Sequence, residues 1–433
     1  MAKPLREQHI AVFGESGSGK TVLLSSFYGA YQEAAFQSAS PFHVVADDIG
    51  QGQRLLKNYY GMKRATQLPA ATRFDASSYA FSLRLRPGLD ADGSAQPAAG
   101  SPGVAAPMAP ESSPSATTAK APKPAKPPKP GKSAPAGMPL ARIVWHDYPG
   151  EWFEQDVSGP EEAARRVATF RSLLVSDVAV LLIDGQRLLE HRGEEERYLR
   201  PLFTGIQNGL LSLRTEILPK GEPLVDAPRI WMLALSKADL LPEMSTRDFQ
   251  ELVIEKAADE LGLLRETLRS FVRAGDALAV GEDFLRLSSA RFQPGTIDVS
   301  TRVGLDLLLP VAAMLPMQRH LRWARTLEMP RRVVDDLLSG ADGVKAVLPV
   351  LATGLGVAAR APLPPQIRTV LKGASVAVSA GAVVQLLDLV GDDLVAANRR
   401  AMARKDHLSA VLTGFLLDLE RGERDGTLVR SPR

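Results

Sequence analysis

Eight consecutive residues near the start of the chain have the types and spacing that phosphate binding requires. The segment Gly14-Glu15-Ser16-Gly17-Ser18-Gly19-Lys20-Thr21 fits the pattern G-x-x-x-x-G-K-[ST] at every fixed position. Glycines allow consecutive backbone N–H groups to point at phosphate oxygens, and the first turn of a helix adds positive partial charge. Lys20 would contact β- and γ-phosphate oxygens, and the Thr21 hydroxyl would bind Mg2+. This predicts a nucleotide site; a glycine-rich turn that matches by chance is the alternative.

The flanking sequence supplies the elements that such a loop needs. Residues 9–13 are typical of a short buried strand, and residues 21–36 of a helix with an apolar face. Apolar or alternating runs that predict further strands follow at 42–46, 79–86, 140–145, 177–185 and 229–235. Helical sequence separates several of them, most clearly at 50–63 and 246–272. The alternation predicts an α/β fold with a doubly wound, mostly parallel sheet, and ligand contacts at the carboxyl ends of its strands.

Composition limits the class of protein. The chain has 433 residues, a net charge of +3 and no cysteine. Its weak basic balance does not favour nucleic acid as a partner. The absence of cysteine excludes disulfides and thiolate chemistry and fits a reducing cytoplasm. Residues 1–8 lack the apolar core of a signal peptide. We therefore expect a cytoplasmic protein, with a peripheral position at the inner membrane face as the alternative.

One internal segment has a composition that cannot form a packed core. Residues 88–138 are dominated by Ala, Pro, Ser, Gly and Lys, which predicts a disordered insertion. Five of its lysines recur at every third position and would line one edge of a polyproline II rod: Lys120, Lys123, Lys126, Lys129 and Lys132. We interpret the segment as a soluble spacer; an electrostatic grip on an anionic membrane or acidic partner is the alternative. If strands 79–86 and 140–145 pair, it is an extended hairpin loop at the end of the sheet away from the phosphates.

Four further segments follow the glycine-rich loop in a fixed order. They are a threonine-bearing polar loop, Asp147-Tyr148-Pro149-Gly150, Ser236-Lys237-Ala238-Asp239 and Ser288-Ser289-Ala290. Over residues 8–325 this order resembles the five motifs of the P-loop GTPases of the translation-factor and Ras-like class. Within that class the loop and the segment around Asp147 look most like bacterial GTPases of conflict and defence gene neighbourhoods, the double-GTPase group. One such module is visible in this chain.

The resemblance implies a role for each segment. Asp147 would hold Mg2+ through water, and the Gly150 amide would touch the γ-phosphate. Lys237 would pack its stem over the base, while Asp239 would accept hydrogen bonds from guanine N1 and the exocyclic amine. GTP or GDP and Mg2+ are the implied ligands. The residues placed at the nucleotide are Gly14, Glu15, Ser16, Gly17, Ser18, Gly19, Lys20, Thr21, Val22, Gly150, Ser236, Lys237, Asp239, Ser288, Ser289 and Ala290.

Two residues bear on hydrolysis. By the resemblance, Thr72 would sense the γ-phosphate, with Thr66 as the alternative. Glu151 occupies the position where many such GTPases carry a glutamine that orients the attacking water. A carboxylate beside a triphosphate is unfavourable, so we expect slow intrinsic hydrolysis that a partner accelerates by supplying an arginine. The alternative is that Glu151 is a surface residue next to Trp152.

The sequence beyond the motifs predicts helices. Two apolar runs, 344–359 and 374–390, flank a proline-marked basic turn and predict a helical hairpin. Each run is shorter than the ~20 residues of a membrane span and carries a charge, so we expect a buried pair; a membrane-inserting hairpin is the alternative. Residues 392–421 have the spacing of an amphipathic helix.

These patterns combine into one expectation about domains and function. A GTPase domain would comprise residues 1–87 and 139–328, interrupted by 88–138 and followed by a helical region at 329–433. The chain would bind guanine nucleotide, hydrolyse GTP slowly with Mg2+ and switch conformation for a protein effector or a GTPase-activating partner. An ATP-using P-loop NTPase and a non-hydrolysing nucleotide-bound interaction module are the alternatives.

Overall fold

The computed structural model describes residues 7–65, 67, 69, 77–86, 139–150, 159–218, 220–225, 229–272, 278, 280–293, 296–316, 318–319, 391–403 and 407–431. Several predictions concern residues outside these ranges. They are the insertion 88–138, the apolar runs 344–359 and 374–390, and the hydrolysis residues Thr66, Thr72 and Glu151.

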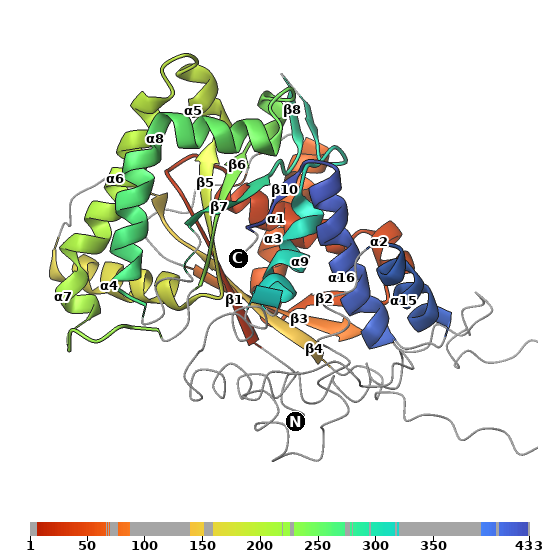
Figure 1. The fold of residues 1–433 in the computed structure, drawn as a ribbon. Coiled ribbons are helices and arrows are strands. Elements are labelled where there is room, and N and C mark those ends of the chain that lie inside the picture. The colour runs from red at the N-terminus through yellow and green to blue at the C-terminus, as the bar shows by residue number, and fades with distance from the viewer. Residues whose placement is uncertain are drawn as a thin grey trace, which may run out of the picture.

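A large mixed sheet organises the described residues (Figure 1). It has eight strands in the order β10-β7-β6-β5-β1-β4-β3-β2. The five neighbours β7, β6, β5, β1 and β4 are parallel, whereas β10, β3 and β2 each run antiparallel to the strand that they join. The strand bounds are β1 Glu7–Phe13, β2 Phe42–Ala46, β3 Ser77–Leu85, β4 Pro139–Asp147, β5 Val178–Asp184, β6 Ile230–Ser236, β7 Val280–Arg286 and β10 Leu428–Val429. The predicted α/β class with a mostly parallel sheet is confirmed.

Helices cover both faces of the sheet (Figure 1). One apolar core lies between the sheet and α4 (Pro160–Val175), α6 (Glu196–Ser212) and α8 (Thr246–Arg269). The other lies against α1, α3, α9 and α16. The remaining helix bounds are α1 Lys20–Tyr31, α2 Ala34–Ala39, α3 Ile49–Ala65, α5 Gly185–Glu190, α7 Arg214–Ile217, α9 Leu308–Ala313, α15 Asp392–Ala403 and α16 His407–Arg424, with 3-10 turns at Ala238–Leu240 and Leu305–Leu307. A separate hairpin is formed by β8 (Arg291–Gln293) and β9 (Thr296–Asp298).

The central strands are the apolar runs of the sequence. Every residue of β5 and β6 is buried, because each strand has parallel neighbours on both edges and helices on both faces. Their register pairs Val178 with Ile230 and Asp184 with Ser236. The polar residues that end these strands therefore meet at one edge of the sheet.

The predicted pairing of the strands on either side of residues 88–138 is confirmed. β3 and β4 form an antiparallel pair in which Phe81 lies opposite Ile143 and Ser77 opposite Asp147. The strand ends that lead into the insertion, near Leu85 and Pro139, lie at the other end of the pair. The insertion thus joins the sheet at the end away from Asp147.

The helix predicted for residues 21–36 is wrong in its length. Glu33 has extended backbone angles, φ −68° and ψ 140°, so α1 ends at Tyr31 and α2 begins at Ala34. The Glu33 carboxylate accepts hydrogen bonds from Tyr59 and from Lys63, the latter at 2.6 Å. These contacts attach the break in the helix to α3, and periodicity within one segment does not reveal them.

The C-terminal part of the chain completes the sheet. β10 pairs with β7, and Val411, Phe415 and Leu419 of α16 lie in the same core as β1. A buried ion pair joins Arg319 to Asp283 of β7 at 2.5 Å, and the Ser431 amide donates to the same carboxylate oxygen at 2.9 Å. The single amphipathic helix predicted for residues 392–421 is wrong in its extent, because the structure has two helices there, α15 and α16. β10 was not predicted. Across the described ranges, no helix has the length and apolar character that crossing a membrane requires.

Candidate functional site

The glycine-rich loop connects β1 to α1 and bends in a way that glycine permits. Gly14, Gly17 and Gly19 have φ of 152°, 81° and 90°, values that residues with a Cβ rarely adopt. A Cβ on Gly14 would also lie 2.7 Å from the Leu182 carbonyl oxygen on β5. Gly14 thus allows close approach to the sheet, while Gly17 and Gly19 turn the backbone toward the start of α1.

The ammonium of Lys20 lies within the curve of this loop. Its Nζ donates to the carbonyl oxygens of Gly14 and Glu15, each at 2.8 Å, and lies 3.4 Å from the Ser18 hydroxyl. Positive charge is therefore concentrated where the loop and the α1 N-terminus meet. This arrangement is suited to an anion, because charge-assisted hydrogen bonds to phosphate are among the strongest available in proteins.

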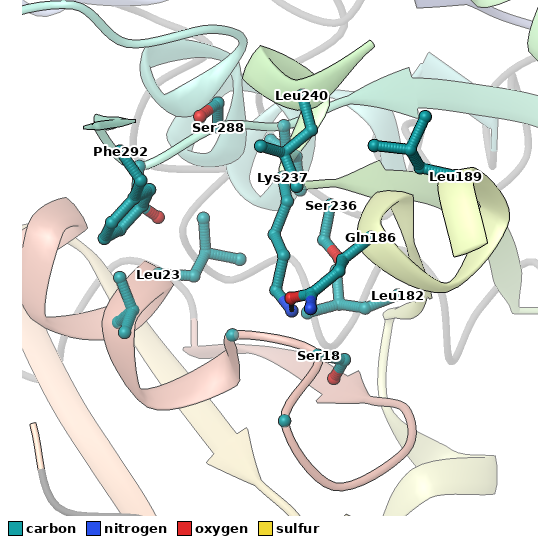
Figure 2. A pocket seen from close by; sticks show the side chains of 15 residues that line it. Ser18, Leu23, Leu182, Gln186, Leu189, Ser236, Lys237, Leu240, Ser288 and Phe292 are labelled. Atoms are coloured by element: carbon teal, nitrogen blue, oxygen red, sulfur yellow. Dashed lines mark hydrogen bonds between the residues drawn. The ribbon is translucent and has the colours of Figure 1, made fainter. Parts of the chain in front are cut away.

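The loop and two of the later segments line one cavity of about 500 Å3. This volume lies within the usual range of small-molecule sites. Figure 2 shows Ser18 at the loop, Lys237 and Ser236 from the end of β6, and Ser288 from beyond β7 around the same hollow. The predicted site residues on the wall are Gly17, Ser18, Gly19, Val22, Ser236, Lys237, Ser288 and Ser289.

Lys237 extends along the cavity with its backbone in a left-handed conformation. Its φ is 51°, the one positive value for a non-glycine residue in the described part of the chain. The Nζ lies 2.7 Å from Asp184 Oδ2 and 3.2 Å from Gln186 Oε1. The ammonium is thereby held at the end of β5, which leaves the aliphatic stem along the cavity (Figure 2). Unusual backbone geometry of this kind is common at functional sites.

Asp239 joins the segment after β6 to the segment after β7. Its Oδ1 accepts a hydrogen bond from the Ser288 hydroxyl at 2.7 Å, and its Oδ2 accepts one from the Phe292 amide at 3.1 Å. Ser288 and Phe292 line the cavity, whereas Asp239 and Ala290 are not among its described lining residues. A carboxylate has about four acceptor positions, so these two bonds leave Asp239 able to accept more.

Asp147 and Gly150 reach the loop from the other side. Asp147 ends β4, is fully buried and lies beside Val12 of β1 in the parallel register. A Cβ on Gly150 would lie 2.2 Å from the backbone nitrogen of Ser16. The segment that follows β4 therefore packs directly on the glycine-rich loop.

The oxygen donors of Thr21 and Asp147 match the chemistry of Mg2+. Thr21 lies half-buried in the first turn of α1, and Asp147 ends the strand next to β1. Mg2+ is usually held by one or two protein oxygens plus substrate phosphates and water. In the described ranges, no cluster of three or more His, Cys, Asp or Glu is placed to hold a metal. The residues present thus fit a metal shared with phosphate better than a cage built from protein alone.

Some cavity residues were not predicted. Gln186, Leu240 and Phe292 line it, and Asp184 fixes the end of Lys237. Asp184 ends a predicted buried strand, a position that could have drawn attention to it. Phe292 lies four residues after Ser288 in the sequence. An aromatic residue at that position does not by itself indicate a binding site, and only the fold shows that its amide contacts Asp239.

Thr72 and Glu151 lie outside the described residues, although their flanks are placed. β3 begins at Ser77, opposite Asp147, and Gly150 lies against the loop. A comparison with protein-family models and with curated proteins found no match to this chain.

Proposed function

We propose that this chain is a GTP-binding protein of the P-loop type, which hydrolyses GTP slowly with Mg2+ and acts as a conformational switch for a partner protein. One observation carries the proposal. The glycine-rich loop shares a single cavity with the two segments, Ser236–Asp239 and Ser288–Ala290, that resemble guanine-recognition motifs. The sheet is compatible with a P-loop fold, and we propose that fold for the described parts of residues 1–87 and 139–328.

The phosphates would bind at the loop. Its amides and the Lys20 ammonium provide donors and positive charge at the start of α1. Mg2+ would be held by Thr21 and Asp147, and when bound it neutralises charge on the β- and γ-phosphate oxygens. Gly150 brings its backbone against Ser16, which suits an amide that detects the terminal phosphate. The proposed switch would then depend on whether this amide has a terminal phosphate to contact.

The base would bind at the other end of the cavity. Asp239 would contact it there: its carboxylate, a pure acceptor, is bonded to two residues that line the cavity, Ser288 and Phe292. Guanine presents two adjacent donors, N1–H and the exocyclic amine, whereas adenine presents an acceptor at N1. A site built around an acceptor pair disfavours a ligand that leaves the pair unsatisfied. This chemistry favours GTP and GDP over ATP.

Two residues outside the described ranges, Glu151 and Thr72, bear on hydrolysis. Glu151 would contact the attacking water and Thr72 the γ-phosphate, but a second negative charge near the triphosphate disfavours the reaction. Slow turnover suits a switch whose timing is set by a partner. A partner that supplies an arginine would stabilise the charge that develops in the transition state.

Equilibrium binding of labelled GTP with Mg2+, competed by unlabelled GTP, GDP and ATP, tests the proposal. Strong competition by GTP and GDP but not by ATP is the expected result, together with slow phosphate release. Lys20→Ala should abolish binding or turnover, whereas the control Lys63→Ala, which removes a surface ion pair with Glu33, should not. Equal competition by ATP would favour an ATP-using enzyme. Tight GTP binding without phosphate release would favour a non-hydrolysing interaction module.

A further inference from the structure

The hairpin that follows the Ser288 segment contributes an aromatic wall to the cavity. Phe292, on β8, is half-buried and lines the same hollow as Lys237 and Ser288. It is the aromatic residue among the described cavity-lining residues. Figure 2 shows Phe292 and Lys237 on two sides of this part of the hollow, with Leu23 nearby. The hairpin belongs to none of the motifs found in the sequence.

We propose that Phe292 is the nucleobase-stacking residue of this site and that Asp239 positions it. This inference rests on the proposed function, because it assigns the part of the cavity that would hold the base. Aromatic side chains stack on nucleobases through their π-faces, largely without regard to base identity. Phe292 would therefore contribute affinity for nucleosides in general, and Asp239 the preference for guanine.

The backbone of Phe292 is held by Asp239. Its amide donates to Asp239 Oδ2 at 3.1 Å, while Asp239 Oδ1 accepts from Ser288 at 2.7 Å. One carboxylate thus holds both the serine segment and the aromatic residue. Because Asp239 already orients two parts of the wall that would contact the base, binding would lose less conformational entropy.

The hairpin is also supported from behind. Phe292 pairs with Ile297 across the β8–β9 hairpin. Ile297 and Val299 are buried in a small apolar cluster with Tyr59 and Met62 of α3, and Phe292 packs against that cluster. At the far end of the hairpin, Asp298 accepts hydrogen bonds from Ser300 and Thr301. These contacts keep the ring at the cavity, where it can stack on a base.

The opposite wall suits a flat apolar ligand as well. The Lys237 ammonium is drawn to Asp184 at 2.7 Å, so its methylene stem lies along the cavity. Leu23 and Leu287 add apolar surface between the loop and the hairpin. A base between Phe292 and the Lys237 stem would contact apolar groups on both faces and polar groups of the Ser288 segment at its edge.

The test compares Phe292→Leu, Phe292→Trp and the wild-type chain in competition binding with Mg2+. The competitors are GTP, GDP and inorganic tripolyphosphate, which has phosphates but no base. Leucine keeps apolar bulk and removes the π-face, so the affinities for GTP and GDP should each fall by about 5- to 150-fold. The affinity for tripolyphosphate should stay within about 2-fold, a change worth less than 0.5 kcal/mol. Phe292→Trp should bind nucleotides at least as well as the wild-type chain.

A matched control is Phe36→Leu, which removes a half-buried aromatic on α2 outside the described cavity wall and should leave GTP affinity unchanged. Unaltered GTP affinity in Phe292→Leu would overturn the stacking role and leave the proposed function intact. Equal loss of GTP and tripolyphosphate affinity would also overturn it, because the residue would then support the whole site. A wild-type chain that binds tripolyphosphate but neither nucleotide would contradict the proposed function itself.

Discussion

The ammonium of Lys237 lies 2.7 Å from the Asp184 carboxylate, and this ion pair links the ends of the neighbouring strands β6 and β5. Asp184 is buried and also caps α5 by accepting from the Gln186 amide at 2.9 Å. Its own amide donates to the Tyr198 hydroxyl at 2.9 Å. A carboxylate with so many contacts holds Lys237 in one place along the cavity.

We predict that Asp184→Asn weakens the binding of GTP and GDP alike by about 3- to 10-fold. Asparagine keeps a side-chain oxygen for the Gln186 amide but removes the charge that orients Lys237. The loss is modest because the Lys237 side chain is 24% exposed and solvent screens such pairs. Isothermal titration with each nucleotide measures it. Asp259→Asn, on an exposed position of α8, is the control, and equal effects of the two variants would contradict the role of Asp184.

We predict that Asp239→Asn lowers the preference for GTP over ATP by about 10-fold or more. The amide retains one oxygen for Ser288 or Phe292, whereas its NH2 group faces a guanine amine that needs an acceptor. Competition binding with both nucleotides gives the ratio of affinities. A ratio that matches the wild-type chain would remove Asp239 from base recognition.

We predict that Gly150→Ala displaces the glycine-rich loop and lowers GTP affinity by about 10-fold or more. The added Cβ would lie 2.2 Å from the Ser16 backbone nitrogen, so one of the two segments must move, and misplaced binding groups reduce affinity sharply. Gly159→Ala is the matched control, since a Cβ there has open space around it. Nucleotide titration and thermal unfolding of both variants separate loss of binding from loss of stability. Unchanged binding in Gly150→Ala would show that the contact is not needed.

A histidine pair at the start of β1 and the end of β4 makes stability depend on pH. His9 Nδ1 and His146 Nε2 lie 2.9 Å apart, and Ser78 Oγ lies 2.8 Å from His146 Nδ1. Glu7 contacts His9, and Tyr148 stacks on His146. Burial, and then the nearby charge of His9, lower the pKa of His146 to about 4.

His146 should therefore destabilise the fold as the pH falls. The unfolded chain takes up a proton near pH 6.5, whereas the folded chain does so near pH 4. Protonation of His146 does not lower the free energy of unfolding above about pH 6.5. As the pH falls from 6.5 toward 4, the free energy of unfolding decreases by up to roughly 3 kcal/mol in total. Urea unfolding at pH 7.5 and 5 should show a smaller loss for His146→Asn than for the wild-type chain. The control His191→Asn should follow the wild type; parallel curves for all three would contradict the assignment.

Replacing residues 88–138 by a flexible turn of about six residues should leave the sheet and GTP binding intact. β3 and β4 are paired up to Arg84 and Pro139, so a short turn can join the two strands. If the segment is flexible, as its composition predicts, a loop about eight times shorter has a lower entropic cost of closure. The free energy of unfolding should then rise by about 2 kcal/mol. Denaturant unfolding measures this change. A strong loss of stability would show that the segment contributes to the folded core.

Local signals predicted much of the fold. The apolar run at 177–185 contains β5, a strand buried on both faces. A continuous apolar run of this length is typical of such a strand, so its burial could be predicted from composition alone. The hairpin of β3 and β4 was predicted across the insertion because each strand has its own pattern. The glycine-rich loop was found because its chemistry needs fixed residues at fixed spacing.

The remaining features depend on contacts between distant residues. The bond between Asp239 and Phe292 joins positions separated by 53 residues, and neither position is unusual in isolation. The break between α1 and α2 depends on Glu33 reaching Tyr59 and Lys63. β10 has two residues, too few for any periodic signal. The position of β10 depends instead on its pairing with β7, whose residue Asp283 forms the buried ion pair with Arg319.

The position of β10 has a consequence for synthesis of the chain. Ser431 binds Asp283, which is made 148 positions earlier. At 5–20 residues per second, β7 leaves the ribosome roughly 7 to 30 seconds before the strand that will cover it. Until then an edge of β7 has unpaired backbone groups, a feature that promotes association with other chains. Completion of the sheet beside the Ser288 segment thus waits until β10 has been made.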